Sequence, residues 1–378
     1  MTLALMLSKL KHKVIILDKS SKKKLLEVKD SRTSAISQGS SRILKEISLW
    51  NKIKNKAQPI NEINVSEGTN ANELNFNSES LNEGALGYIV DNTYLKKIFF
   101  KEVLKSKLIK FIGEVNIKDI KSTSGSATIF SNKGNFTAQL IVGADGRNSK
   151  MRFFANIKSF FFDYNQTAFV FNITHTLSHQ SKAIERFFPS GPLALLPMQN
   201  NNKKSSSVVW TVDSALVKKL LGNKDFYNEF EKKYADAFGR VIKASKPAIY
   251  NLNIISCYEY FRERIVLVGD ACQAIHPIAG QGLNLGLRDS HHLAKIISNS
   301  LELGLDIGST HVLRDYSLKR LVDKRLLIQA THRLNQLFSN NSKIIKAIRE
   351  NGLKIFNKSN YLKKKSMMFA MGLMRFDF

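Results

Sequence analysis

Apolar and polar positions along this chain follow a helical period in some stretches and a strand period in others. At the start, Leu3, Leu7 and Leu10 recur at helical spacing, and a basic turn then leads into the wholly apolar run VIIL at 14–17. A short run of this kind is typical of a buried parallel strand, and Asp18 closes it. Helix, turn, buried strand and acidic residue together indicate the second half of a βαβ unit.

Two further helices are expected in the first 110 residues. The first follows a turn at 37–41, and Asn92 is the predicted N-cap of the second. Their predicted apolar sides consist of Ile43, Leu44, Ile47 and Trp50 in the first helix, and of Leu95, Ile98, Phe99 and Val103 in the second. Between them, short alternating segments over 60–90 predict strands with one exposed face.

The pattern changes between about 155 and 255. Phenylalanines cluster in FFANIKSFFFDYNQTAFVF, Gly and Pro interrupt ERFFPSGPLALLPM, and SSSVVWTV is typical of a strand. This region predicts an antiparallel sheet with one apolar face. Beyond it the chain returns to a strand, a glycine-rich loop and a helix, and the remainder is expected to be helical. The fold class is therefore α/β, with a β-rich region inserted between nucleotide-binding segments.

Composition narrows the class of protein. The 378 residues are 43% hydrophobic, and 58 basic against 31 acidic residues give a net charge of +27. Most of this charge is expected on solvated faces, and attraction to an anionic membrane surface is the favoured functional interpretation. Nucleic-acid binding is not expected, because the chain has no RNA-binding aromatic signature and no basic helix with heptads. No zinc-ligand spacing, secretory signal or membrane-spanning run is visible in the sequence. The two cysteines, Cys257 and Cys272, form no C-x-x-C arrangement and indicate a reducing compartment.

The strongest chemical signal is the stretch VLVGDACQAIHPIAGQGLNLG. A buried strand at 265–268 brings Gly269 and Asp270 to its carboxyl end, where open α/β sheets bind ligands. Gly280 and Gly282 then allow the backbone to approach a flat or phosphorylated ligand closely. A helix is expected to start near Leu283, so its free N–H groups and positive dipole end would point at that ligand.

This stretch closely resembles the second FAD motif of the class A FAD-dependent aromatic hydroxylases, which have the para-hydroxybenzoate hydroxylase-like fold. HPIAGQGLNLGLRD is similar in particular to the ubiquinone-biosynthesis hydroxylases of the 2-polyprenyl-6-methoxyphenol hydroxylase type. GADGRNSKMR resembles the DG motif of the same family. ERFFPSGPLALLP, the late LNQLFSNNSKIIKAIRENGLKIF and AMGLM resemble the subfamily. The resemblance covers essentially the whole chain.

The resemblance implies a set of cofactor-binding residues. Asp270 matches the aspartate that binds the ribityl chain, Pro277 the proline at the flavin face, and Arg32 an arginine near the pyrophosphate. The complete implied set is Asp18, Arg32, Asp145, Gly146, Gly269, Asp270, Pro277, Gly280, Gln281, Gly282, Leu283 and Asn284. Thr93 departs from the arginine that many relatives carry. No catalytic acid or base is assigned, because His276 matches a residue that shapes the motif, and no metal site is expected.

The family also places a strand and a G-x-G-x-x-G turn before a helix very like TLALMLSKLKHKV, so the last glycine of that turn would fall just upstream of Met1. Asp18 then stands at the position where, in the family, an acidic side chain forms hydrogen bonds with the ribose hydroxyls. We favour a start codon assigned at an internal methionine, and a genuinely shortened protein is the alternative. Translation of the DNA upstream of Met1 discriminates between the two.

By this resemblance the FAD-binding Rossmann-like domain, with its first strand missing, comprises 1–60, 85–154 with the DG motif, and 256–325 with the GD motif. Residues 61–84 and 155–255 form the substrate-binding sheet, and 326–378 the C-terminal helices. The implied activity uses NAD(P)H and O2 to hydroxylate a polyprenylated phenol. The expected location is cytoplasmic, peripheral to the inner face of the membrane, beside other ubiquinone-biosynthesis enzymes. The alternatives are a flavin hydroxylase of a soluble aromatic compound and a cofactor-poor, lipid-binding or scaffold relative.

Overall fold

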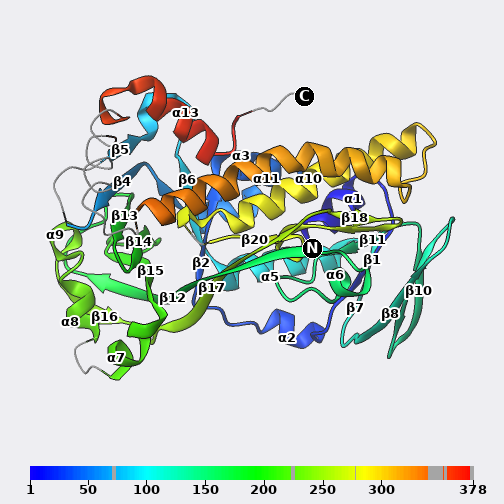
Figure 1. The fold of residues 1–378 in the computed structure, drawn as a ribbon, viewed down its shortest axis with the longest axis horizontal. Coiled ribbons are helices and arrows are strands. Elements are labelled where there is room, and N and C mark those ends of the chain that lie inside the picture. The colour runs from blue at the N-terminus through cyan, green and yellow to red at the C-terminus, as the bar shows by residue number, and fades with distance from the viewer. Residues whose placement is uncertain (70–73, 223–225, 277, 339–351, 353–355, 375–378) are drawn as a thin grey trace.

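The computed structural model of this chain shows an elongated α/β molecule with a large sheet at one end and two long helices running along its length (Figure 1). It describes residues 1–69, 74–222, 226–276, 278–338, 352 and 356–374. Helices α10 (Gly282–Glu302) and α11 (Thr310–Phe338) pack against each other over the nucleotide-binding strands. The predicted α/β class with a helical C-terminal part is confirmed.

Two parallel strand pairs form the region that the sequence predicts to bind a nucleotide. Strand β1 (Val14–Leu17) pairs with β7 (Ile109–Ile112), and β11 (Ile141–Gly143) pairs with β19 (Ile265–Leu267). All three residues of β19 are buried, as their apolar sequence predicts. The prediction that β1 is buried is wrong, because Ile15 is 48% exposed. Among the described residues β1 has a strand neighbour on one side alone, which leaves its other edge uncovered.

The main core lies between these strands and the helices above them. Helix α1 (Thr2–Lys9) packs on α10, with Met6 and Leu7 buried as their spacing predicts, whereas Leu10 lies beyond the helix and is 40% exposed. Side chains from β19, α10 and α11 fill the space between the layers; examples are Val266, Leu267, Leu293, Leu313 and Tyr316, which are all fully buried. None of the described helices is both long and apolar enough to cross a membrane.

A nine-stranded sheet forms the other end of the molecule. Its order is β20-β17-β12-β15-β14-β13-β4-β5, with β16 also paired to β12, and every pair is antiparallel except β13–β4. The strands are β4 (Glu62–Glu67), β5 (Leu74–Asn77), β12 (Ser159–His175), β13 (Lys182–Phe188), β14 (Gly191–Pro197), β15 (Ser205–Asp213), β16 (Val241–Ala244), β17 (Ala248–Cys257) and β20 (Gln273–Ala274). One face packs on an aromatic cluster that includes Phe171, Trp210 and Phe230. The predicted inserted sheet with an apolar face is confirmed.

A small sheet connects these two regions. Its strands are β2 (Thr33–Ser37), β6 (Gly87–Asp91) and β3 (Gln58–Ile60), in the order β2-β6-β3. Ser37 caps the helix that follows β2, α3 (Gln38–Glu46), and Asp91 caps the helix that follows β6, α5 (Asn92–Lys105).

The second of these caps corrects the sequence prediction. Asn92 was the expected N-cap of α5, but the carboxylate of Asp91 accepts the N–H of Tyr94 at 2.8 Å. Asp91 ends strand β6 with extended backbone angles, which is the geometry that an N-cap residue requires. Of the predicted apolar side of α5, Leu95 and Val103 are buried and Ile98 and Phe99 are partly buried.

The remaining elements lie at the periphery. A three-stranded meander projects from the end of the molecule opposite the large sheet (Figure 1). It consists of β8 (Ile117–Ser122), β9 (Ala127–Ser131) and β10 (Gly134–Ala138). The other described elements are α2 (Lys22–Leu26), α4 (Trp50–Ile53), α6 (Lys150–Phe154), α7 (Val217–Gly222), α8 (Phe226–Glu231), α9 (Ala235–Phe238), β18 (Phe261–Arg262) and α13 (Asn360–Ala370).

Candidate active site

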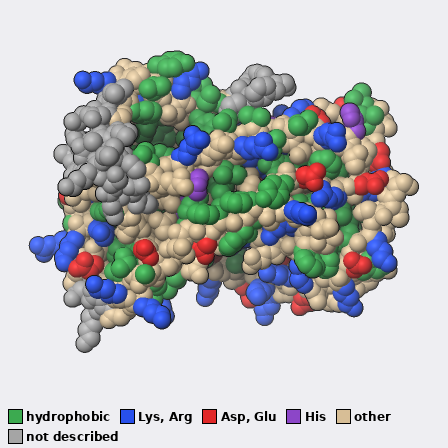
Figure 2. All heavy atoms as spheres, in the orientation of Figure 1, with side chains coloured by type: hydrophobic (Ala, Val, Ile, Leu, Met, Phe, Trp, Pro, Cys, Tyr) green, Lys and Arg blue, Asp and Glu red, His purple; other side chains and the backbone are tan. Residues whose placement is uncertain are grey.

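A large cavity among the described residues lies between the nine-stranded sheet and the region of the parallel strand pairs. Its volume is about 1330 Å³, and its walls come from the sheet, β2, the start of α10, α11 and α13. Figure 2 shows a hollow with hydrophobic walls at the end of the molecule where α13 lies. Arg32 and the strand that follows it, β2, line the cavity as far as Ser37, with a polar end of the cavity at Arg32 and an apolar end beyond Ser37.

The polar end is built around an ion pair. Arg32 donates to the carboxylate of Asp30 through two nitrogens, at 2.8 and 2.7 Å, and its guanidinium lies 5.3 Å from the centre of the Tyr250 ring. The hydrogen bonds from Arg32 lower the pKa of Asp30 well below its ordinary value. Thr93 holds the backbone of Asp30 through hydrogen bonds of 2.9 and 3.0 Å, and Lys96 adds a second cation at 2.6 Å.

Asp270 faces the same end of the cavity from the loop after β19. Its carboxylate accepts no hydrogen bond from any described residue. Burial raises its pKa, and the positive charges of Arg147 and Arg32 oppose that rise without cancelling it. Arg147 lines the cavity as well and donates to the backbone oxygen of Asn253 at 3.1 Å. The polar end therefore offers cations and an acceptor to a ligand with hydroxyl and phosphate groups.

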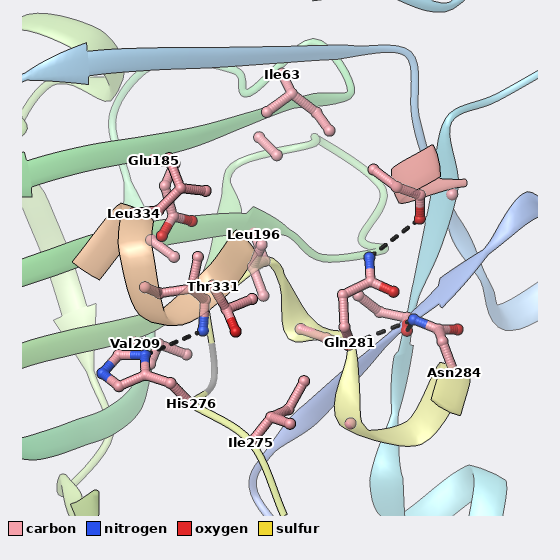
Figure 3. Close-up of a pocket in the computed structure, with 18 of the residues that line it drawn as sticks. Ile63, Glu185, Leu196, Val209, Ile275, His276, Gln281, Asn284, Thr331 and Leu334 are labelled. Carbon is pink, nitrogen blue, oxygen red and sulfur yellow. Dashed lines mark hydrogen bonds between the residues drawn. The ribbon is translucent and has the colours of Figure 1, made fainter. Parts of the chain in front are cut away.

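The first turn of α10 forms the middle of the cavity. Asn284 fixes it to β2, because its side chain accepts the N–H of Ser37 at 2.9 Å and donates to the oxygen of Ala35 at 3.0 Å (Figure 3). Gly280 has φ +59°, and a Cβ there would lie 3.1 Å from that of Ala35. Nothing lies within 4 Å of a Cβ placed on Gly282, so the helix start is open to the cavity.

The apolar end lies beyond this turn, beneath α13. Gln281 donates to the oxygen of Ala370 at 3.1 Å, and the oxygen of Met371 accepts the N–H of Gly39 at 2.8 Å, which fixes α13 there. The apolar end is lined by side chains from β4, β5, α11 and α13, from the residue before β6 and from the residue after α13: Ile63, Val65, Leu74, Phe76, Leu86, Leu334, Met367 and Met371. It offers a long hydrophobic chain a place next to the helix start.

Comparison with known proteins identifies the family. Residues 1–329 match the family described as FAD binding domain. The chain belongs to this family. It is 33% identical over 378 residues to ubiquinone hydroxylase UbiL of Rhodospirillum rubrum, an alignment that covers 99% of this chain and 87% of that protein. It is 27% identical to 3-demethoxyubiquinol 3-hydroxylase of Escherichia coli over 356 residues, which are 91% and 88% of the two chains.

A solved structure agrees on the fold. p-Nitrophenol 4-monooxygenase PnpA of Pseudomonas putida DLL-E4 superposes with a TM-score of 0.80 at 17% identity, covering 99% of this chain and 95% of that one. The expected membership in the class A flavin hydroxylases of ubiquinone biosynthesis is confirmed, and the chain is an FAD-dependent aromatic hydroxylase.

The cavity fits the flavin of this family. The open helix start offers unpaired N–H groups and a positive dipole end, which suit the pyrimidine edge of a flavin. Arg32, Arg147 and Asp270 would hold the ribityl and phosphate groups. The cavity also exceeds the range of about 300–1,000 Å³ that is common for one small ligand, which leaves room for a second molecule.

The predicted FAD residues fall into two groups. The cavity is lined by Arg32, Asp270, Gly280, Gln281, Gly282, Leu283 and Asn284. Asp145 instead lies at the start of α6, whose N-cap is Ser149; it accepts from the Ser149 hydroxyl at 2.5 Å and from the N–H of Lys150 at 2.7 Å.

Asp18, Gly146 and Gly269 also lie outside the cavity wall. Asp18 accepts the N–H of Ser20 at 2.7 Å, and Gly146 and Gly269 adopt positive φ of 83° and 58° in their turns. Pro277 lies outside the described residues. The FAD roles of the whole set stay predictions.

His276 is buried and neutral. Burial lowers its pKa to about 4, its Nε2 lies 3.3 Å from the amide oxygen of Gln166, and its ring packs edge-on against Tyr164. A neutral ring in this packing agrees with a residue that shapes the loop.

Sequence reasoning missed a buried ionic layer behind the GD loop. Asp289 of α10 accepts from Arg320 at 2.8 Å and from Lys324 at 3.0 Å, and it also accepts the N–H of Gly269 at 2.9 Å. Asp323 joins Arg320 at 2.7 Å. The spacing of 320, 323 and 324 places three charges on one face of a helix, a signal that could have indicated a buried layer.

It also missed Glu185 of β13. This carboxylate lines the cavity, and burial raises its pKa to about 7. No described residue donates a hydrogen bond to it. Alternation along β13 places Glu185 on the same face as Ala183 and Phe187, so the strand pattern could have indicated a carboxylate among apolar residues, although not the cavity that this face meets.

Proposed function

We propose that this chain hydroxylates the aromatic ring of a polyprenylated phenol in ubiquinone biosynthesis, with NAD(P)H and O2 as co-substrates. The observation that carries the proposal is the continuity of one cavity. It joins a polar end at Arg32 and Asp270 with the open start of α10 and with an apolar end under α13. The order of the surroundings along the cavity, from the polar end past the start of α10 to the apolar end, suits a phenol with a hydrocarbon tail.

The residues have separable roles in this proposal. Bound FAD would supply the redox chemistry that activates O2. Arg32, Arg147 and Asp270 bind the cofactor's polar chain, and the start of α10 orients its ring. The apolar wall binds the prenyl tail and excludes water from the aromatic ring. The chain segments 1–60, 85–154 and 256–325 form the cofactor part, and 61–84 and 155–255 form the substrate sheet.

We also propose that the chain contacts the cytoplasmic face of the inner membrane, near other enzymes of the pathway, because a prenylated substrate dissolves in lipid. Two observations support the contact. The net charge is +27, and helix α13, at the apolar end of the cavity, carries three consecutive lysines at 363–365 beside Tyr361 and Leu362, which are 69% and 42% exposed.

The test uses the purified chain loaded with FAD. The protein is incubated with NADPH, or in parallel NADH, and 2-methoxy-6-geranylphenol, and the products are analysed by mass spectrometry. The proposal expects retained yellow flavin absorbance and a product that carries one additional oxygen atom, labelled when ¹⁸O2 is supplied.

Two results contradict the proposal in different ways. Equal turnover of 2-methoxyphenol without a tail would indicate a soluble aromatic substrate. Failure to retain flavin at saturating FAD would remove the oxygenase function altogether. Flotation with vesicles of phosphatidylglycerol and phosphatidylethanolamine tests the membrane contact independently of turnover.

A further inference from the structure

Glu185 is the carboxylate in the substrate part of the cavity. The only other carboxylate that lines the cavity among the described residues is Asp270, at the polar end. Glu185 stands opposite Val65 of β4 and Ala194 of β14, and Ala194 in turn stands opposite Val209 of β15. All four line the cavity, so the carboxylate interrupts a row of apolar side chains that crosses four strands.

The neighbours of Glu185 along β13 show where it lies relative to the loop that leads into α10. Ala183 packs in one cluster with Ala35, which faces Gly280. Phe187 packs in another cluster with Ile278. Residues two apart on a strand are separated by about 7 Å. Glu185 lies between these two residues on the same face of β13, and it therefore faces the cavity on the side of the loop that leads into α10.

Helix α11 closes the space on another side and offers Glu185 no cation. Figure 3 shows Glu185 projecting toward the part of α11 that carries Thr331 and Leu334, with Gln281 and Asn284 across the cavity. The hydroxyl of Thr331 donates to the backbone oxygen of Leu327 at 2.9 Å, within its own helix. Glu185 is partly buried in an apolar wall, and none of the described residues donates to its carboxylate. Such a position is costly for a charge, and a ligand that brings a donor would offset this cost.

Among the residues that the structure describes, the charged and titratable groups that line the cavity besides Glu185 are Arg32, Arg147, Tyr250, Asp270, His276 and Lys365. On β4, Glu67 shares the face of Glu185 and stands opposite Phe187. Strand β14 has no titratable residue, and the His332 ring on α11 is engaged with Tyr164 at 3.0 Å.

We propose that Glu185 is the general base that accepts the proton of the substrate's phenolic hydroxyl. The O–H bond breaks, the proton passes to a carboxylate oxygen of Glu185, and the electron pair stays on the phenolic oxygen. The products of this step are a neutral carboxylic acid and a phenolate, and no oxidation state changes. The phenolate ring has a greater electron density than the ring of the neutral phenol, so it reacts more readily with an electrophilic oxygen. The inference rests on the proposed function, because it requires a phenolic substrate.

The electrostatics suit this role. The pKa of Glu185 is about 7, and a general base is most effective when its pKa lies near the working pH. Below pH 7 the carboxylate is protonated and cannot accept a proton, so turnover should fall as the pH is lowered through 7. Above pH 7 the base is ionised and turnover should reach a plateau.

The first experiment measures binding to the FAD-loaded protein without NAD(P)H. The ligands are 2-methoxy-6-geranylphenol and its methyl ether, which has no proton to donate. We expect the phenol to bind about tenfold more tightly at pH 8 than at pH 6, as the ionised fraction of Glu185 increases, while the ether gains nothing. An equal pH response of the two ligands would overturn the proposal.

The second experiment measures turnover of Glu185→Gln, which keeps the size of the side chain and removes the base. We expect kcat to fall by about 10²-fold and the acidic limb of the pH profile to disappear. Glu185→Asp should retain the acidic limb of the pH profile, with a lower kcat. The matched control is Glu263→Gln, an exposed position, which should leave both unchanged. A Gln variant with the kcat and pH profile of the original chain would overturn the role.

The outcomes separate the two proposals. If the original chain does not hydroxylate any prenylated phenol, the proposed function fails whatever Glu185 does. If it does hydroxylate them and Glu185→Gln behaves like the original, the inference about Glu185 fails alone. If the Gln variant does not fold, Glu185→Asp and the comparison of phenol with ether still decide.

Discussion

Two carboxylates in this protein, one fully buried and one partly buried, have opposite surroundings. Asp289 lies in the ionic layer between α10 and α11, and Glu185 lies in the apolar wall of the cavity. Burial raises the pKa of both. At Asp289 the charges of Lys324 and Arg320 and the hydrogen bonds it accepts outweigh that effect, so its pKa is lowered. At Glu185 none of the described residues supplies a compensating cation, and its removal from water raises its pKa to about 7.

The two surroundings indicate different roles: Asp289 supports the fold, and Glu185 is available for chemistry. Asp289 is permanently ionised and fixes the N–H of Gly269, so the ionic layer holds the GD loop in one conformation. Glu185 can change its protonation state near neutral pH and faces open space. A buried charge that is paired on every side is a structural element, whereas an unpaired one in a cavity is a candidate for function.

The largest effect should come from breaking the paired region. Asp289→Asn leaves Arg320 and Lys324 buried without their anion, which should lower the free energy of unfolding by ~3–5 kcal/mol. Urea denaturation followed by circular dichroism measures it. Asp315→Asn is the control on the same helix; its exposed pair with Lys319 should contribute less than ~0.5 kcal/mol. Equal effects of the two substitutions would show that the ionic layer is not a support.

The next largest effect is expected at Glu185, where the effect on the free energy of unfolding depends on pH. The folded-state pKa of Glu185 lies above its ordinary 4.5, so the stability that its protonated form contributes is present at low pH and is lost as the pH rises through 7. Glu185→Gln should therefore stabilise the protein at pH 9 relative to pH 5, by on the order of 3 kcal/mol. Thermal unfolding at the two pH values measures the difference, with Glu263→Gln as the control. A pH-independent difference would contradict the unpaired state of Glu185.

A smaller effect is expected where the two regions meet. Gly280→Ala places a side chain on a residue with φ +59°, 3.1 Å from Ala35, which should strain the start of α10 by ~1 kcal/mol or more. FAD affinity, measured by fluorescence quenching, should fall about tenfold. Gly125→Ala, where nothing lies within 4 Å, should leave it unchanged. Unchanged FAD affinity in Gly280→Ala would show that the turn at Gly280 does not bind the flavin.

Local pattern was sufficient for the parts of the site that lie on one continuous stretch. The apolar run at 265–267, the glycines of the loop and the start of α10 near Leu283 follow one another in sequence, and the structure has them in that order. The glycines also needed no distant partner to be recognised, because their backbone conformation is a local property.

What depends on distant contacts could not be read in the same way. Glu185 meets the cavity because β13 pairs with β4, more than a hundred residues earlier in the chain. Asp289 is paired only once α11 folds back onto α10. The cap at Asp91 and the exposure of Ile15 likewise depend on where a strand ends and on how many neighbours it has. Periodicity indicates which face of an element is apolar, and pairing decides what that face meets.

The central claim is that the apolar end of the cavity binds a prenyl tail while the aromatic ring lies at the start of α10. The most direct test is the ratio of kcat/KM for 2-methoxy-6-geranylphenol to that for 2-methoxyphenol on the FAD-loaded chain. Burial of a methylene is worth about 0.8 kcal/mol, so the account predicts a ratio well above tenfold. A ratio near one would contradict it.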